Sequence, residues 1–125
     1  MRVLDGSLAL CRLAPGAAVP EARGPFWSLT RTAAETSLVC AEDDAPVKGT
    51  VVGGYLALEV EGPLDLALTG VMAAIAEPLA DAGVPILPIA THDTDYVLLP
   101  GALLGVAAEA LRAAGHDVIE NAQPE

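Results

Sequence analysis

The fold is decided by residues 55–120, which read YLALEVEGPLDLALTGVMAAIAEPLADAGVPILPIATHDTDYVLLPGALLGVAAEALRAAGHDVIE. The first apolar run, Tyr55–Val60, stops before a Gly-Pro pair and is typical of a strand. Within Leu66–Ala82, apolar residues recur at positions 68, 71, 72, 75 and 79, which is the spacing of one face of a helix. Gly83 follows as a helix stop. This part of the chain therefore predicts a strand followed by a helix.

The remainder of the stretch predicts two strands, a helix and a last strand. The strands are Val84–Ala90 and Tyr96–Leu99, the helix is Ala102–Ala114, and the last strand is His116–Glu120. The helix is expected to face the core with Leu103, Val106, Ala107, Ala110 and Leu111. The order strand, helix, strand, strand, helix, strand is the ferredoxin-like βαββαβ unit, so the fold class is α+β.

The N-terminal part predicts strands without full helices. Ser7–Leu13, Phe26–Thr32 and Thr36–Ala41 are rich in apolar and β-branched residues, as strands are. Ala17–Pro25 is interrupted by glycine and proline and has room for one helical turn at most.

This part also echoes the stretch above. Leu8–Leu10 repeats Leu56–Leu58 at an offset of 48, and the strand pair Phe26–Val39 resembles Ile86–Leu98 at an offset near 60. The shorter first offset corresponds to a missing first helix. We therefore interpret the N-terminal half as a shortened copy of the C-terminal half.

The expected organisation is thus two tandem modules of one fold. Residues 1–50 form a degenerate module and residues 51–125 a complete one. If the modules pair edge to edge, their strands make one continuous sheet. Strand edges that stay unpaired favour a homodimer, because they seek partners.

Composition excludes several classes of partner. The formal net charge is −11, with six Lys and Arg residues, so the chain cannot offer the basic face that nucleic acid requires. An anionic membrane would repel it for the same reason. The longest helix-like apolar stretch, Leu64–Leu79, contains Asp65, Glu77 and Pro78 and does not predict a membrane span. No signal peptide is recognised. We expect a cytoplasmic protein.

Four motifs carry a family resemblance. EGPLDLALTG at Glu61–Gly70, IAEPLA at Ile75–Ala80, THDTDYVL at Thr91–Leu98 and the TRT pattern from Thr30 to Val39 occur in the order found in small bacterial ACT-domain proteins. The chain resembles that family, and its motifs are also similar to the modules of eukaryotic cytosolic arginine sensors.

The resemblance implies a regulatory function. ACT domains bind amino acids at interfaces between modules and report occupancy to an attached enzyme or partner. It therefore implies an amino-acid sensor without catalytic activity, which acts on a regulated enzyme. The chain departs from the family pattern at Leu66, Ala90 and His92, which leaves the identity of the ligand open. The alternative is a ligand-free module for dimerisation or protein interaction.

The first candidate ligand site is the turn from strand into helix, with Asp65, Leu66, Thr69 and Gly70. The first backbone N–H groups of a helix lack partners and carry a partial positive charge, which suits a ligand carboxylate. Gly70 lets a ligand approach the backbone closely. Asp65 could instead serve only as the helix cap.

The second candidate ligand site is Thr91, His92, Asp93, Thr94 and Asp95. Two carboxylates beside hydroxyl groups suit the ammonium group or guanidinium of an amino acid. The alternative is a solvated hairpin turn, for which Asp and Thr are ordinary residues. The hypothesis is an amino acid with its carboxylate at Leu64–Gly70 and its amine near Asp93 or Asp95.

Other chemistry is not predicted. A metal on His92, Asp93 and Asp95, completed by His116 or Asp117, lacks any established ligand spacing. With two histidines, no nucleophile motif and no phosphate loop, no catalytic residue and no cofactor is expected. Cys11 and Cys40 form no CxxC pair and are expected to be buried free thiols.

Overall fold

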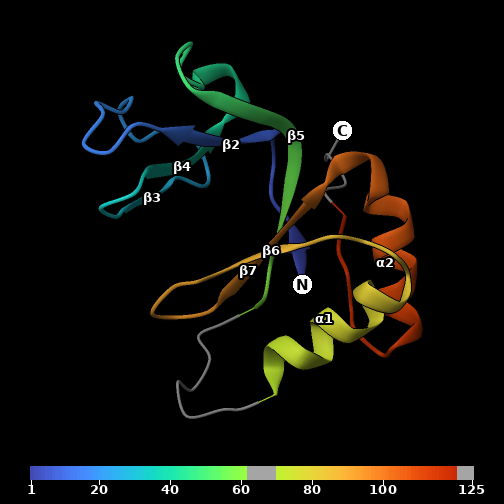
Figure 1. Cartoon of the computed structure of the whole chain (residues 1–125). Coiled ribbons are helices and arrows are strands. Elements are labelled where there is room, and N and C mark those ends of the chain that lie inside the picture. The colour runs from blue at the N-terminus through green and yellow to red at the C-terminus, as the bar shows by residue number, and fades with distance from the viewer. Residues whose placement is uncertain (62–69, 121–125) are drawn as a thin grey trace. The chain divides into compact units, whose positions relative to one another are not determined.

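The computed structural model describes residues 1–61 and 70–120, which form two compact units (Figure 1). The N-terminal unit is Gly6–Tyr55. The C-terminal unit is Met1–Asp5 together with Leu56–Glu125. The division falls within one long strand, β5 (Thr50–Glu59), and the first five residues belong with the second unit.

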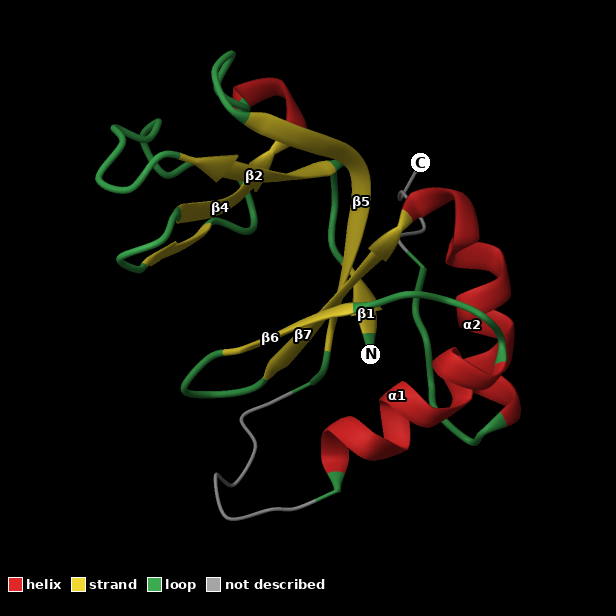
Figure 2. Ribbon diagram, in the orientation of Figure 1, coloured by secondary structure: helices red, strands yellow, loops and turns green. Residues whose placement is uncertain are grey.

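The C-terminal unit has the predicted ferredoxin-like order of elements (Figure 2). After β5 come α1 (Val71–Asp81), β6 (Leu87–Ala90), β7 (Asp95–Pro100), the short 3-10 helix η2 (Gly101–Leu103) and α2 (Leu104–Ala113). The strands lie in the order β6-β7-β5, and β1 (Arg2–Val3) pairs with the other edge of β5. The predicted α+β fold is therefore confirmed.

The prediction of a last strand at His116–Glu120 was wrong in its extent. The strand is reduced to one parallel bridge between Ile119 and Arg2, in which the Val3 N–H donates to the Ile119 oxygen at 3.0 Å. The place beside β5 is taken by β1, with Arg2 opposite Glu59 and Val3 opposite Leu58. A two-residue strand is too short to show a period, so the sequence pattern could not reveal it.

The core of the C-terminal unit lies between its sheet and its helices. Its largest buried side chains are Leu58, Leu79, Leu99 and Leu111. On α1, Ile75 and Leu79 are buried as predicted. On α2, the buried residues are Ala107, Ala108 and Leu111, whereas Val106, predicted to face inward, is 45% exposed. The 3-10 turn before α2 winds three residues per turn, so extrapolating the helical face from Leu103 misplaces it.

The N-terminal unit is a sheet without an α-helix in Gly6–Tyr55. Its strands β2 (Leu8–Leu13), β3 (Ser28–Arg31), β4 (Thr36–Ala41) and the first part of β5 are all antiparallel, in the order β3-β4-β2-β5. One core cluster contains Ala9, Cys11, Leu38 and Cys40, with Val19, Trp27, Leu29 and Ala45 packed against it. Both cysteines are buried free thiols, as predicted. Burial raises the pKa of Cys40 to about 11.

Two hairpins share one register. In β3–β4, Ser28 pairs with Val39. In β6–β7, Leu87 pairs with Leu98, so both strands are displaced by 59 residues. A 3-10 turn follows each hairpin, η1 (Glu42–Asp44) after β4 and η2 after β7. The two hairpins are therefore equivalent in geometry.

Candidate functional site

The second predicted site forms the turn between β6 and β7. The Thr91 N–H donates to the Thr94 oxygen at 2.8 Å, and the Thr91 hydroxyl donates to the same oxygen at 3.1 Å. These bonds close the turn on itself. The hairpin is thus a fixed element, in which Thr91 has a structural partner.

Thr94 ties this turn to the end of β5. Its side chain is buried, and its hydroxyl donates to the Val60 carbonyl oxygen at 2.6 Å. The Val60 N–H in turn donates to the Asp95 carbonyl oxygen at 3.0 Å. Asp95, the first residue of β7, is half-buried. Thr94 therefore positions Asp95 beside Val60.

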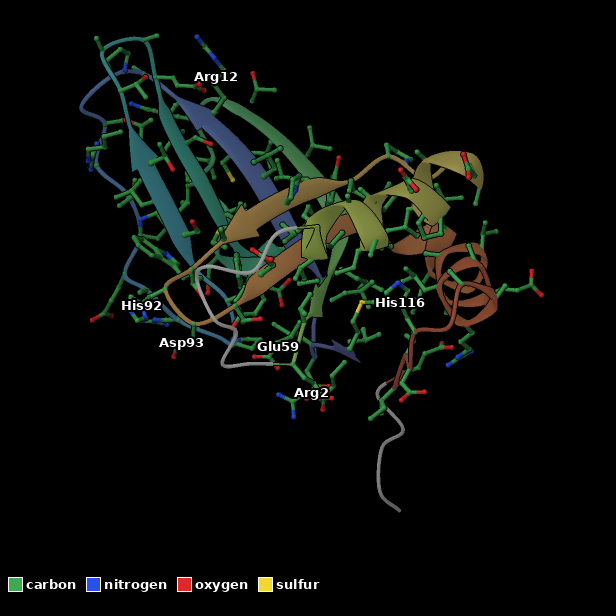
Figure 3. The ribbon with its side chains drawn as sticks, turned by 90° about the horizontal axis from the view of Figure 1, so that it is seen from below. Arg2, Arg12, Glu59, His92, Asp93 and His116 are labelled. Carbon is green, nitrogen blue, oxygen red and sulfur yellow. The ribbon has the colours of Figure 1, made fainter. Side chains whose placement is uncertain are left out.

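His92 and Asp93 lie at the exposed tip of the hairpin (Figure 3). His92 Nδ1 is 2.9 Å from Asp93 Oδ1, and their side chains are 86% and 74% exposed. Such a solvated pair contributes little stability. The structure thus brings Thr94 and Asp95 to the end of β5 and leaves His92 and Asp93 in solvent.

The first predicted site is described only at Gly70. Asp65, Leu66 and Thr69 lie outside the described residues. Gly70 is the N-cap of α1 with φ +81°, and its carbonyl oxygen accepts the Ala74 N–H at 3.0 Å. A residue with a side chain would be strained at this φ. A Cβ there would meet nothing within 4 Å, so the space beside the start of α1 is open.

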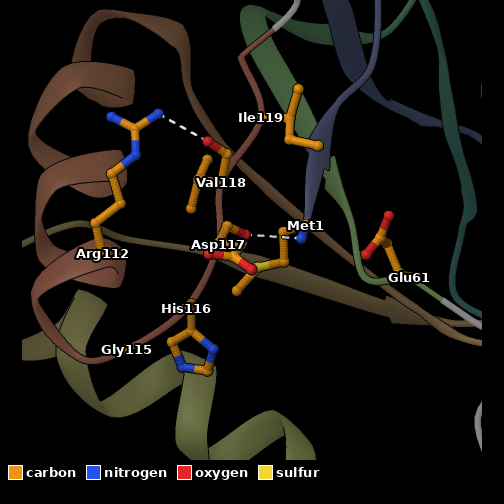
Figure 4. A pocket seen from close by; sticks show the side chains of 8 residues that line it. All are labelled: Met1, Glu61, Arg112, Gly115, His116, Asp117, Val118 and Ile119. Atoms are coloured by element: carbon orange, nitrogen blue, oxygen red, sulfur yellow. Dashed lines mark hydrogen bonds between the residues drawn. The ribbon is translucent and has the colours of Figure 1, made fainter.

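A feature that the sequence did not reveal lies next to Gly70. Two adjoining cavities of about 430 and 590 Å³ share the lining residues Met1, Glu61, Gly115, His116 and Asp117. Figure 4 shows the residues that line the larger one. The smaller cavity is also lined by Val71 and Ala74 in the first turns of α1. These volumes exceed what a single amino acid occupies.

Several polar groups of the lining are held by hydrogen bonds. His116 Nε2 is 2.9 Å from the Ala74 carbonyl oxygen, so this nitrogen carries the proton. The Met1 amino group donates to the Asp117 carbonyl oxygen at 2.8 Å, and Arg112 donates to the Val118 oxygen at 2.7 Å. In the larger cavity the Glu61 and Asp117 carboxylates stand beside two cationic groups, the Arg112 guanidinium and the Met1 amino group. A lining with charges of both signs suits a ligand that carries both a cationic and an anionic group.

A separate polar ladder crosses the sheet of this unit. Arg2 on β1 donates to Glu59 on β5 at 2.8 Å, and the Tyr96 hydroxyl on β7 donates to the other Glu59 oxygen at 3.1 Å. Burial, followed by the Glu59 carboxylate, raises the pKa of Tyr96. The ladder links three strands side by side, as Figure 3 shows for Arg2 and Glu59.

Comparison with known families shows which family the chain belongs to. The family model of the ACT domain matches residues 50–113, about half of the chain. The chain belongs to the ACT domain family. A second family model, described as an N-terminal domain, matches residues 6–48. The ACT match spans α1, the β6–β7 hairpin and α2.

Solved structures agree with the ACT fold. A crystal structure of an Agobacterium tumefaciens protein has a TM-score of 0.90 at 31% identity, covering 99% of this chain and 94% of that one. The regulatory subunit of aspartate kinase from Thermus thermophilus has a TM-score of 0.62 at 16% identity, covering 91% and 97%. Clostridium acetobutylicum aspartate kinase, called an allosteric enzyme, has a TM-score of 0.67 at 10% identity, covering 90% of this chain and 34% of its own.

No curated protein matches the chain. None of the helices in the described ranges is both long and apolar enough to cross a bilayer. Residues 1–61 and 70–120 hold no group of three His, Cys, Asp or Glu side chains arranged for a metal ion.

Proposed function

We propose that this ACT-domain chain is a regulatory protein of the cytoplasm that binds an amino acid and has no catalytic activity of its own. One observation carries the proposal. The cavity beside the start of α1 is large enough for an amino acid, and its lining includes the Glu61 and Asp117 carboxylates and the Met1 amino group. The similarity to the regulatory subunit of an aspartate kinase supports the same type of function.

The proposed ligand lies across the start of α1. Glu61 and Val71 both line the smaller cavity, and the predicted turn with Asp65, Leu66, Thr69 and Gly70 connects them along the chain. The ligand carboxylate would meet the backbone N–H groups of this turn. Its ammonium group would meet both the Glu61 carboxylate and Asp95, whose backbone oxygen accepts the N–H of the lining residue Val60.

We also propose that the N-terminal unit is a degenerate ACT module. Its strand order, β3-β4-β2-β5, has the same antiparallel pattern as β6-β7-β5-β1 in the C-terminal unit. The shared hairpin register and the 3-10 turn after each hairpin support a common origin. In this proposal the irregular segment between β2 and β3 replaces the first helix, and η1 replaces the second.

Thermal unfolding in the presence of each of the twenty amino acids tests ligand binding. We expect one or a few amino acids to raise the Tm at millimolar concentration, because a ligand that binds the folded state stabilises it by mass action. Asp95→Ala and Glu61→Gln should each reduce the rise. Asp43→Asn removes a carboxylate from the N-terminal unit and should preserve it. If no amino acid raises the Tm of the wild-type chain, the sensor proposal fails.

A ligand-free interaction module is the second candidate. It is favoured by exposed valines on β5, which lie outside the cavity. In either case we propose a homodimer that acts on a partner such as a regulated enzyme.

A further inference from the structure

The helix α1 contains a proline, Pro78, inside its span of Val71–Asp81. In an α-helix each N–H donates to the carbonyl oxygen four residues earlier, and proline has no N–H to donate. The oxygen four residues before Pro78 is that of Ala74. A main-chain oxygen without its helical donor takes another partner. Pro78 therefore makes one carbonyl of α1 available to a different part of the chain.

The partner of this carbonyl is His116, in the turn that follows α2. His116 Nε2 lies 2.9 Å from the Ala74 oxygen, although the two residues are 42 positions apart. A carbonyl oxygen only accepts, so Nε2 is the donor. The side chain of His116 thus ties the end of α2 to the middle of α1.

The backbone of His116 is held as well. The His116 N–H donates to the Leu111 oxygen at 3.0 Å, and the Gly115 N–H donates to the Arg112 oxygen at 3.0 Å. These two bonds form the Schellman motif that ends many helices. Gly115 has φ +96°, a conformation that favours glycine. Backbone and ring of His116 are therefore both fixed by the protein.

The second nitrogen of the His116 ring is left as an acceptor. In a neutral imidazole with its proton on Nε2, Nδ1 carries a lone pair. His116 lines both cavities, and Figure 4 shows its ring between α1 and the side chains of Met1 and Asp117. Within residues 1–61 and 70–120 no group bonds to Nδ1. The cavity wall thus includes an oriented acceptor with no described partner.

An ammonium group presents three N–H donors, and the proposed function supplies acceptors for two of them, Glu61 and Asp95. Glu61 and His116 line the same smaller cavity. We propose that His116 is a specificity-determining residue, whose Nδ1 accepts a hydrogen bond from the ammonium group of the bound amino acid. Pro78 and Ala74 are positioning residues, because they hold the ring in the tautomer that can accept. This contact rests on the proposed function.

Calorimetric titration of His116→Gln tests the contact. The probes are the one of the twenty amino acids that raises the wild-type Tm most, and its 2-hydroxy acid, which has a hydroxyl in place of the ammonium. The Gln amide can still donate to Ala74 but has no acceptor at the position of Nδ1. We expect about tenfold weaker binding of the amino acid and little change for the hydroxy acid. His116→Asn, which has an oxygen near the position of Nδ1, should lose less.

Pro78→Ala tests the positioning role. It gives residue 78 an N–H that competes with His116 for the Ala74 oxygen. Without amino acid the variant should have a higher Tm, because proline is unfavourable inside a helix. Its affinity for the same amino acid should fall several-fold. A proline with a merely structural role would not move stability and affinity in opposite directions. The matched control is Pro85→Ala, an exposed proline after α1, which should leave the affinity unchanged.

The outcomes separate this contact from the proposed function. If no amino acid raises the wild-type Tm, the proposed function and the contact both fail. If the wild type binds an amino acid and His116→Gln binds it equally tightly, or weakens the amino acid and the hydroxy acid alike, the role of His116 alone is overturned. Unchanged affinity in Pro78→Ala overturns the positioning role of Pro78. Circular dichroism checks that each variant is folded, and His116→Ala replaces His116→Gln with the same expectation if the latter is not.

Discussion

At the scale of single residues, one carboxylate holds the irregular part of β5. Glu42 Oε1 accepts a hydrogen bond from the Ser7 hydroxyl at 2.6 Å and another from the Gly54 N–H at 2.9 Å. The register between β2 and β5 shifts here, and Gly54 has φ +79°. A Cβ on Gly53 would lie 2.8 Å from Glu42 Cδ, so glycine leaves room for the carboxylate. These hydrogen bonds lower the pKa of Glu42, mainly the one from Ser7.

The lowered pKa of Glu42 predicts how the free energy of unfolding changes as the pH falls. Because the folded pKa of Glu42 lies below its unfolded value, its ionised form contributes stability above the unfolded pKa. That contribution is lost as pH falls through the folded pKa. Urea unfolding should show Glu42→Gln to be less stable than wild type at pH 7, with a smaller difference at pH 3. Asp43→Asn, which removes a neighbouring carboxylate, is the control. Equal pH dependence in the two variants would contradict the role of Glu42.

At the scale of elements, sequence periodicity predicted the helices and strands that have repeating apolar patterns. It missed features that depend on contacts between residues far apart in the chain. The strands of both hairpins and the buried face of α1 follow from local patterns. The cavity does not follow from local patterns, because the segments that line it are brought together by β1 and the bridge at Ile119. The hydrogen bond from Met1 to the Asp117 oxygen joins residues 116 positions apart. The sequence allowed Thr91–Asp95 to be interpreted as a hairpin turn. Only the structure shows that the Thr94 hydroxyl donates a hydrogen bond to Val60.

The corrected face of α2 gives a second prediction. Leu111 is fully buried in the core of the C-terminal unit, whereas Val106 is 45% exposed. Leu111→Ala should lower the free energy of unfolding by about 2–5 kcal/mol, because it leaves a cavity in a packed core. Val106→Ala on the same helix should change it by less than about 0.5 kcal/mol. Denaturant unfolding of both variants measures this. Similar losses in the two would place Val106 in the core, as the sequence pattern implied.

At the scale of the whole molecule, the chain passes from one unit to the other more than once. β5 supplies residues to both, with Thr50–Tyr55 in the N-terminal unit and the rest in the C-terminal unit. Met1–Asp5 also belongs to the C-terminal unit, although it precedes the other. A module defined as a continuous sequence segment therefore omits part of its own core. Met1 and Val3 are both buried in that core.

Removal of residues 1–5 should consequently weaken the C-terminal unit, although the deletion lies far from it in sequence. The deletion removes the Met1 oxygen that accepts the Ile119 N–H at 2.9 Å, together with the strand beside Leu58 and Glu59. It also removes two buried side chains, each worth about 1.5–3 kcal/mol when fully buried. Hydrogen exchange should therefore become faster across the C-terminal unit, at the Ile119 amide and in the core around Leu111. The amides of β2 and β4 should keep most of their protection, because their pairing to each other uses no residue of the deleted segment. Unchanged exchange at Ile119 and Leu111 would show that β1 is dispensable and that residues 56–120 form a complete fold by themselves.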